Sequence, residues 1–297
     1  MRHAYLITVY KEPTQLIDLV DSLDGPDSTF HIAVDAKSSL CGDARIGELS
    51  ARANVRLSSD IRINWGGYSH LRALVRLLGA AVDEGRFDYA HALSGQCFPL
   101  TSARERDLLL ESRGLKEHLT VFELPSQTWS GGGTDRYELY HLNDLLDPKG
   151  RWFGKVNPRF LGLQRKLGFK RKKPAFFPQV YGGGTWWSIE REAANYVIGF
   201  VRENPGALKR FRHTHCPEEI FFHSALMNSR FRDQVANDDL RYVDWEYRNG
   251  SCPAYLDEAD FDRAAGSGKL FARKFDSTIS AELRRLLKEH IKNDPQE

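Results

Sequence analysis

Two adjacent carboxylates, Glu218 and Glu219, follow Pro217 in the segment CPEEIFFH (216–223). A carboxylate beside a hydroxyl can accept its proton and activate it as a nucleophile, a contribution of roughly 10²–10⁴ in rate. Proline followed by acids is also typical of the first turn of a helix, and the apolar residues after them favour a buried one. The segment alone is compatible with both a catalytic base and a simple helix start.

The same region contains residue types that bind metal ions, namely His213, His215, Cys216, Glu219 and His223. Histidines near a helix start are more often surface or packing residues, so we expect no metal site here. The chain has no sequence motif of a phosphate loop, a dinucleotide site, a zinc protease or a serine hydrolase. The triple glycines 131–133 and 182–184 are interpreted as flexible or close-approach turns.

The elements that must position these residues alternate in type along the first hundred residues. Short apolar runs predict strands, and apolar residues at helical spacing predict helices from Pro13 and Ser69. The predicted strands are 4–9, 30–34, 55–57 and 89–93. This alternation predicts an α/β fold with a mostly parallel central sheet flanked by helices.

Polar residues follow three of these predicted strands. They are Tyr10-Lys11, the segment Asp35-Ala36-Lys37, and Ser94-Gly95-Gln96. Ligands of parallel α/β sheets bind at the carboxyl ends of the strands. These three loops are therefore candidate binding loops.

Composition narrows the class of protein. The 297 residues carry a net charge of +2 and are 41% hydrophobic, which favours one folded domain over 1–297 and gives no indication of nucleic-acid binding. No apolar run approaches the roughly 20 residues of a membrane span, and the apolar run at the N-terminus is too short for a signal peptide. The four cysteines form no CxxC pair, so we expect neither a disulfide framework nor structural zinc. We expect a cytoplasmic protein.

Residues 148–173 hold ten basic residues and no acidic one. A solvated basic helical insertion is one interpretation. The other is a docking surface for an anionic glycan, a lipid-diphosphate acceptor or an anionic membrane, which the interleaved Trp152, Phe153 and Phe160 support. An amphipathic helix is predicted at about 277–292.

Eight segments in order resemble one known family. They read AYLITVYKEPTQL, FHIAVDAKS, INWGGYSHLRA, FDYAHALSGQCFPL, YGGGTWWSIERE, CPEEIFFHSAL, LRYVDW and LFARKFD. The chain resembles, over about 4–276, the core-2/I-branching β-1,6-N-acetylglucosaminyltransferase and peptide O-xylosyltransferase family. The resemblance implies a GT-A-type nucleotide-sugar transferase fold, transfer with inversion, and no need for a divalent metal or other cofactor.

The resemblance also implies catalytic roles. Glu219 matches the family's base, and Arg241 and Lys274 match cations that neutralise the diphosphate. Fixed cations aimed at developing negative charge are each worth roughly 10²–10³ in rate. Most GT-A enzymes use a metal on an Asp-x-Asp motif instead, whereas the strand end here reads VDAK (34–37).

The remaining site residues follow from the same resemblance and from side-chain type. We expect the nucleotide and donor sugar to contact a set of loop residues: Tyr10, Asp35, Lys37, Trp65, Gly66, Tyr68, Ser94 and Gly95. For the acceptor we expect contacts from an arginine and aromatic rings: Arg136, Tyr137, Trp186 and Trp187. Core packing is the alternative for the paired tryptophans.

One departure from the family pattern is Cys97, where an Asp is usual, and it affects donor or acceptor choice. The resemblance predicts transfer of GlcNAc or xylose from a UDP-sugar to a glycan or lipid-linked saccharide. The setting that we expect is bacterial surface polysaccharide synthesis at the inner face of the membrane. The alternative is an inactive glycan-binding protein on the same fold.

Overall fold

The apolar run at the N-terminus forms β1, which is buried along its whole length in the computed structural model. The structure describes residues 1–292. β1 belongs to a seven-stranded sheet with the order β3-β2-β1-β4-β7-β6-β8. Its strands are β1 (His3–Val9), β2 (Ser28–Val34), β3 (Val55–Ser58), β4 (Tyr89–Ser94), β6 (Glu117–Glu123), β7 (Tyr181–Glu190) and β8 (Val235–Ala236).

Most neighbouring strands of this sheet are parallel. β3, β2, β1 and β4 run in one direction, β7 is antiparallel to both β4 and β6, and β8 is parallel to β6. The predicted α/β fold with a mostly parallel sheet is therefore confirmed. Because β1, β2 and β4 are parallel, the three candidate loops that follow them lie at one edge of the sheet.

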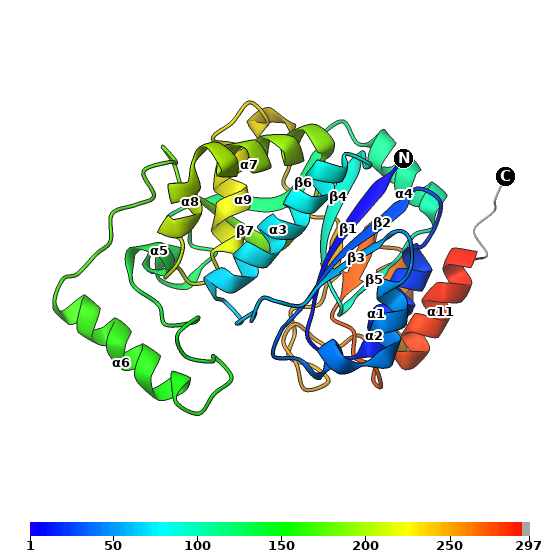
Figure 1. Cartoon of the computed structure of the whole chain (residues 1–297), viewed down its shortest axis with the longest axis horizontal. Helices are drawn as coiled ribbons and strands as arrows, with labels where there is room; N and C mark the ends of the chain where they lie inside the picture. Colours follow the sequence, from blue (N-terminus) through cyan, green and yellow to red (C-terminus); the bar gives the residue numbers. More distant parts are fainter. Residues whose placement is uncertain (293–297) are drawn as a thin grey trace.

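Helices cover both faces of the sheet (Figure 1). Ala4 and Leu6 of β1 pack into a cluster with α3, α7 and α9, while the alternate residues Tyr5 and Ile7 pack against α1 and α2. The helices are α1 (Pro13–Leu23), α2 (Ala44–Ser50), α3 (Tyr68–Glu84), α4 (Ala103–Ser112), α5 (Asp135–Glu138), α6 (Phe153–Lys166), α7 (Arg191–Glu203), α8 (Pro205–Arg210), α9 (Glu218–Met227), α10 (Phe261–Ala265) and α11 (Ala281–Lys292).

A second sheet of three strands is built from segments far apart in the sequence. It consists of β5 (Cys97–Pro99), β10 (Phe271–Arg273) and β9 (Arg241–Val243), in that order. Register pairs Cys97 with Arg273, and Phe271 with Arg241. This small sheet therefore brings the C-terminal basic residues to the turn that follows β4.

The sequence-based boundaries differ from the structure in three places. The basic insertion 148–173 is helical only over α6, and the C-terminal helix begins at Ala281 rather than at 277. Glycines 182–184 belong to β7 and not to a turn. The predicted domain 1–297 includes 293–297, which lie outside the described residues. Within residues 1–292, no helix combines the length and the apolar character needed to cross a membrane.

Candidate active site

The acids of the CPEEIFFH segment lie in the first turn of α9, for which Pro217 is the N-cap residue. Ile220 and Phe221, which follow them, are fully enclosed in the core. Rotation of this helix would expose apolar side chains, so core packing fixes its orientation. Glu219 is thereby held at a fixed position on the rim of the core.

The half-buried carboxylate of Glu219 accepts two hydrogen bonds. Oε2 accepts from Nη1 of Arg136 at 2.6 Å, and Oε1 accepts from the hydroxyl of Thr185 at 3.0 Å. Burial raises the pKa of Glu219 and the nearby Glu218 raises it further, while Arg136 and Thr185 act in the opposite direction. A carboxylate with a raised pKa holds a proton more strongly, which suits a general base.

A tryptophan beneath its guanidinium positions Arg136. The Cζ atom lies 3.5 Å from the ring centroid of Trp129. Glycines make room for that ring, because a Cβ at Gly133 or Gly182 would lie 2.5 Å or 2.7 Å from it. Glycines 131–133 also have φ values of 64°, 78° and 76°, a conformation that favours glycine. The predicted close-approach turn at 131–133 is confirmed.

A bulge in β7 presents Thr185 to the site. β7 pairs with β6 at Trp187 with Leu119 and again at Gly183 with Val121, so Thr120 alone faces residues 184–186. Extra residues in one strand bend it and turn its side chains in a new direction. The bulge is what allows the hydroxyl of Thr185 to reach Glu219.

Glu218 is buried, and its carboxylate has other partners than that of Glu219, although the two lie within 4.8 Å of each other. Its Oε1 lies 3.1 Å from Nδ1 of His70, whose Nε2 lies 3.3 Å from the hydroxyl of Thr8. Adjacent helical residues point about 100° apart, as expected for these two acids. Glu218 therefore acts on Glu219 through its charge and does not share its position.

Two lysines and a tyrosine form a cationic cluster at the carboxyl edge of the sheet. Nζ of Lys274 and Nζ of Lys11 lie 4.8 Å and 5.5 Å from the ring centroid of Tyr255. Lys274 also donates to the hydroxyl of Ser251 at 3.1 Å, and Lys11 lies 3.6 Å from the carboxylate of Asp276. Burial raises the pKa of Tyr255, but the two ammonium groups lower it to a net value below the ordinary one. The cluster has the positive charge that a diphosphate requires.

Arg273 connects this cluster with Glu219. Its Cζ lies 4.7 Å from the ring centroid of Trp186. Burial lowers the pKa of Arg273, while the carboxylates of Asp239 and Glu219 act to raise it. The half-buried side chain of Arg273 thus lies within electrostatic range of both Glu219 and the loop after β1.

Arg241, which the resemblance assigns to the diphosphate, lies outside the cationic cluster. Its guanidinium is buried and donates to the carbonyls of Ala92 and Trp187 at 3.0 Å and 2.9 Å, and to the hydroxyl of Ser188 at 2.7 Å. The β4–β7 pairing ends at His91 and Ser188, so Arg241 fills the gap where the two strands diverge. Burial lowers the pKa of Arg241 to about 10.

The residues expected at the nucleoside lie together at the ends of β1 and β2. Asp35 accepts hydrogen bonds from the backbone N–H groups of Lys37 and Ile63, each at 3.0 Å, and its Oδ2 lies 3.7 Å from Nζ of Lys37. Tyr10 is 43% exposed, and Nζ of Lys149 lies 4.1 Å from its ring centroid. Asp35 therefore shapes the loop, while Tyr10 offers an aromatic face.

The turn after β4 lies against the end of β1. A Cβ at Gly95 would lie 2.6 Å from Val9, and the N–H of Gly95 donates to the carbonyl of Thr8 at 3.0 Å. The hydroxyl of Ser94 lies 3.5 Å from the buried thiol of Cys97. Gly95 is thus required for close packing, and Cys97 touches Ser94 rather than open space.

The WGGY segment (65–68) packs beside the start of α9. Trp65 is 66% exposed and its ring lies edge-on to His215, with centroids 5.6 Å apart. Gly66 has φ of 66° and its carbonyl accepts from the N–H of Cys216 at 2.9 Å. Tyr68, half-buried, begins α3. Of this segment, Trp65 presents the largest free surface.

Three residues predicted to contact the acceptor are buried instead. Trp187 is 1% exposed and packs on Phe222 with ring centroids 4.9 Å apart. Tyr137 is 5% exposed and Trp186 is 7% exposed. The burial of Trp187 matches the alternative of core packing. Of the four residues, Arg136 is the one that contacts Glu219.

The possible metal ligands converge only in part, and no histidine joins the group within residues 1–292. Among residues 1–292, the His, Cys, Asp and Glu side chains close enough to share an ion are Cys216, Glu218 and Glu219, with ligand atoms within 4.8 Å of one another. Burial raises the pKa of the Cys216 thiol well above its ordinary value, which disfavours the thiolate that binds metals. His223 is fully buried within α9. This group is a poor fit for a metal ion.

Comparison with known families adds an independent observation. The profile of the Core-2/I-Branching enzyme family matches residues 3–264. The chain belongs to this family. The resemblance seen in the ordered sequence segments is therefore confirmed.

Two curated relatives illustrate what this Core-2/I-Branching family member is similar to. It is 26% identical over 314 aligned residues to xylosyltransferase 2 of Rattus norvegicus, covering 98% of this chain and 34% of that protein. It is 25% identical to the β-glucuronosyltransferase GlcAT14B of Arabidopsis thaliana, covering 92% and 63%. The chain spans about a third of the length of the xylosyltransferases that it matches. The solved mouse xyloside xylosyltransferase 1 aligns with 11% identity and a TM-score of 0.40, covering 93% and 99%.

Several residues at the site of this Core-2/I-Branching family member are not found by sequence reasoning. Thr185, Trp129 and Tyr255 carried no local signal, because a bulge or a distant segment brings them in. Lys11 lies in the candidate binding loop Tyr10-Lys11, but the sequence assigned it no role at the diphosphate. Arg273 stands beside the predicted cation Lys274 and was likewise given no role of its own.

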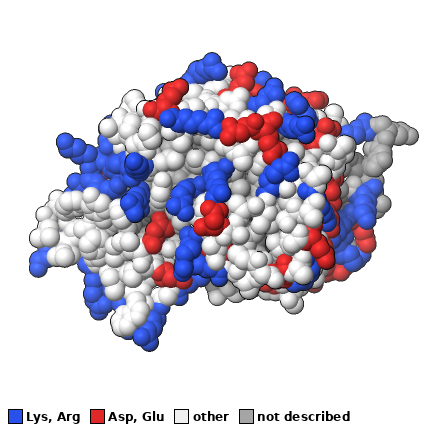
Figure 2. All heavy atoms as spheres, viewed as in Figure 1, with Lys and Arg blue, Asp and Glu red and all other residues white. Residues whose placement is uncertain are grey.

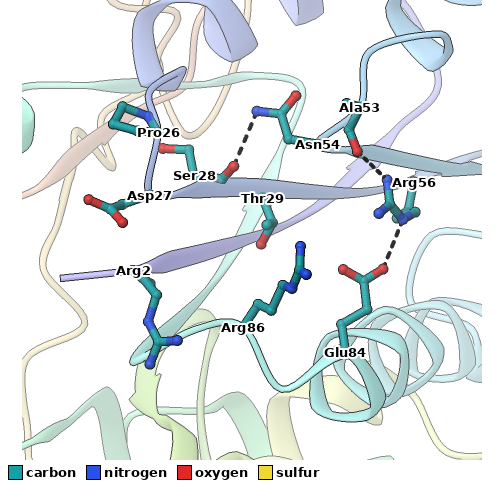
Figure 3. Close-up of a pocket in the computed structure, with 10 residues that line it drawn as sticks. All are labelled: Arg2, Pro26, Asp27, Ser28, Thr29, Ala53, Asn54, Arg56, Glu84 and Arg86. Carbon is teal, nitrogen blue, oxygen red and sulfur yellow. Dashed lines mark hydrogen bonds and ion pairs between the residues drawn. The ribbon is translucent and has the colours of Figure 1, made fainter.

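A pocket of about 430 Å³ lies away from this site. Figure 3 shows its lining at the opposite, amino-terminal end of the strands, with Arg2 and Asp27 among the residues drawn. Arg56 there pairs with Glu84 at 2.9 Å. Its position opposite the carboxyl ends separates it from Glu219.

Proposed function

We propose that this chain is a glycosyltransferase of GT-A-type fold that moves a sugar from a UDP-sugar to a hydroxyl group, with inversion and without a metal ion. Glu219 is the base that takes the proton of the acceptor hydroxyl. Lys274, together with Lys11 and Tyr255, neutralises the diphosphate as it leaves.

The observation that carries the proposal is the setting of Glu219. Its carboxylate is oriented by Arg136 and Thr185, and its pKa is raised by burial. A base of raised pKa can both lose its proton in water at neutral pH and accept one from a hydroxyl in the transition state. Family membership supports the same role, since Glu219 lies in one of the matching segments.

We also propose which sugar donors and which class of acceptor the enzyme uses. Relatives named xylosyltransferase and β-glucuronosyltransferase favour UDP-xylose and UDP-glucuronic acid as donors to test, beside UDP-GlcNAc. The acceptor that we propose is a glycan or a lipid-linked saccharide of a bacterial surface polysaccharide. The exposed ring of Trp65 beside the start of α9 is suited to stack on a sugar.

The first test is Glu219→Gln. We expect transfer, or UDP release from the active donor, to fall roughly 10²–10⁴-fold while UDP binding is retained, because the amide cannot accept the proton. Glu192→Gln, which changes a 75% exposed side chain, is the matched control and should leave the rate unchanged. Turnover of Glu219→Gln near that of the unaltered chain would remove Glu219 as the base.

The second test concerns the diphosphate. We expect turnover to persist in EDTA, and Lys274→Met to raise KM for the UDP-sugar roughly 10–100-fold, because a charged hydrogen-bonding partner is lost. Lys209→Met, on the exposed surface of α8, is the control. Activity that is lost in EDTA and restored by Mn²⁺ would contradict the metal-free proposal.

A further inference from the structure

Helix α6 stands apart from the core at the carboxyl-end side of the sheet (Figure 1). The three hydrophobic clusters of the described residues include no residue of α6. Two buried amides attach it instead: Asn157 accepts from the N–H of Leu142 at 3.2 Å, and Gln164 exchanges two hydrogen bonds with the backbone of Tyr140. The face of α6 that meets the body therefore combines these two amides with the half-buried side chains of Phe153 and Leu161.

One stripe of apolar side chains on α6 faces solvent, and Phe160 within it is half-buried. They recur at helical spacing from the N-cap to the C-cap and fall within an arc of about 80°. The stripe consists of Trp152, Val156, Phe160, Leu163 and Leu167. Trp152, Leu163 and Leu167 are 58%, 52% and 72% exposed. The apolar stripe of this amphipathic helix therefore faces solvent and not the protein core.

Cations border this stripe. Lys155, Arg159 and Lys166 lie on the arc beside it, by the same helical spacing. Of the ten basic residues in 148–173, the salt bridges of the described residues pair Arg165 with Asp135 and Lys170 with Glu138. Figure 2 shows lysine and arginine side chains gathered around this end of the molecule. The surface around the stripe therefore has a net positive charge.

We propose that α6 docks this protein on an anionic lipid bilayer, with the stripe inserted at the headgroup boundary and the lysines and arginines on lipid phosphates. A tryptophan and leucines on one arc with basic residues beside them are typical of helices that lie in a membrane interface. A group of basic residues with no acidic residue among them complements the evenly distributed negative charge of an anionic bilayer. A protein partner with paired charges is a poorer match.

Docking through α6 also has a consequence for the site. Lys149, just before the helix, lies 4.1 Å from the ring centroid of Tyr10, and Asn143 donates to the carbonyl of Trp65 at 3.3 Å. The chain leading into α6 is thus in contact with the candidate site, which would lie at the bilayer surface. That a lipid-linked acceptor is then within reach rests on the proposed function, whereas the docking itself does not.

The experiment is flotation of the whole chain with vesicles of phosphatidylcholine alone or mixed with phosphatidylglycerol. We expect binding to the anionic vesicles, weakened by salt. Leu163→Gln with Leu167→Gln should lower the partition coefficient at least about tenfold, because inserted methylene groups are lost. Lys155→Gln with Lys166→Gln should lower it about fivefold for each lysine. No binding to anionic vesicles would overturn the proposal.

Matched variants separate membrane docking from misfolding and from self-association. Leu108→Gln with Leu115→Gln changes leucines that are 52% and 43% exposed elsewhere on the surface and should leave flotation unchanged. The melting temperature of the Leu163/Leu167 variant should equal that of the unaltered chain, since the stripe is already exposed. Brominated lipids should quench Trp152, so Trp152→Phe should lose that quenching. A dimer that the stripe variant dissociates would assign the stripe to a second copy and overturn the proposal.

Discussion

Glu219 combines two opposing influences at a single residue. Burial and Glu218 raise its pKa, whereas Arg136, at 2.6 Å, and Thr185 lower it. The guanidinium of Arg136 lies over the face of the Trp129 ring, and this cation–π contact stabilises its charge. The balance allows the carboxylate to be ionised and yet to bind a proton when one is released next to it.

This balance predicts a shift of the pH profile. A base must be deprotonated to act, so activity falls below its pKa. Removing Arg136 removes a group that lowers the pKa of Glu219, and the acidic limb of the rate profile should move to higher pH in Arg136→Met. Initial rates of UDP release across pH measure it, with the exposed Arg230→Met as the control. An acidic limb at an unchanged pH would show that Arg136 does not act on the base.

At the scale of elements, the strands β4 and β7 create the site by diverging. Beyond the pair His91 and Ser188, no ladder joins them in the described part of the chain, and the guanidinium of Arg241 bonds to both strands. The bulge of β7, at residues 184–186, lies just before Ser188 in the chain. An arginine from the second sheet thus holds open the place where Thr185 turns toward Glu219.

Arg241→Met should therefore affect stability first. The variant leaves two buried carbonyls without their donor, at about 1–3 kcal/mol each, so we expect the free energy of unfolding to fall by about 2 kcal/mol or more. Urea unfolding measures this, and Lys274→Met, in a half-buried surface cluster, should change it little. An Arg241→Met protein of full stability that has lost UDP affinity would contradict this expectation and favour the diphosphate role that the resemblance implies.

At the scale of the whole molecule, burial keeps several histidines neutral in different parts of the fold. Burial lowers the pKa of His3, His118 and His215 to about 4, and that of His223 to about 3. Nearby arginines act in the same direction on His3 and His118. In the unfolded chain a histidine titrates near 6.5, so the unfolded state takes up protons that the folded state does not bind.

The stability of the folded state should therefore decrease as the pH falls. The folded pKa values are depressed, so the contribution of these groups is complete above about pH 6.5 and is lost as the pH falls toward about 4. We expect the melting temperature to fall over this window, and less steeply in His118→Leu, whose buried ring nitrogens have no hydrogen-bond partner among the described residues. His290→Gln, on the exposed face of α11, should retain the full slope. A flat profile between pH 7 and 4.5 would contradict the prediction.

The sequence by itself determined the parts of this protein that depend on local pattern. Apolar spacing predicted β1, β2, β4, α1 and the start of α9, and the loops after the strands were placed at one edge because parallel strands end together. The ordered segments also indicated the family that the profile match confirms. Each of these signals is contained in a short segment, and short segments are the range over which periodicity and capping operate.

Only the tertiary structure decided which polar side chains meet. Arg136 and Glu219 are 83 residues apart, and Arg241 and Ser188 are 53 apart, so no local pattern records either pair. The paired tryptophans look alike in sequence, yet packing encloses Trp187 against Phe222 and a bulge sets the direction of Trp186. Whether a cation binds a ligand or a backbone carbonyl depends on its burial, and burial is a property of the assembled core.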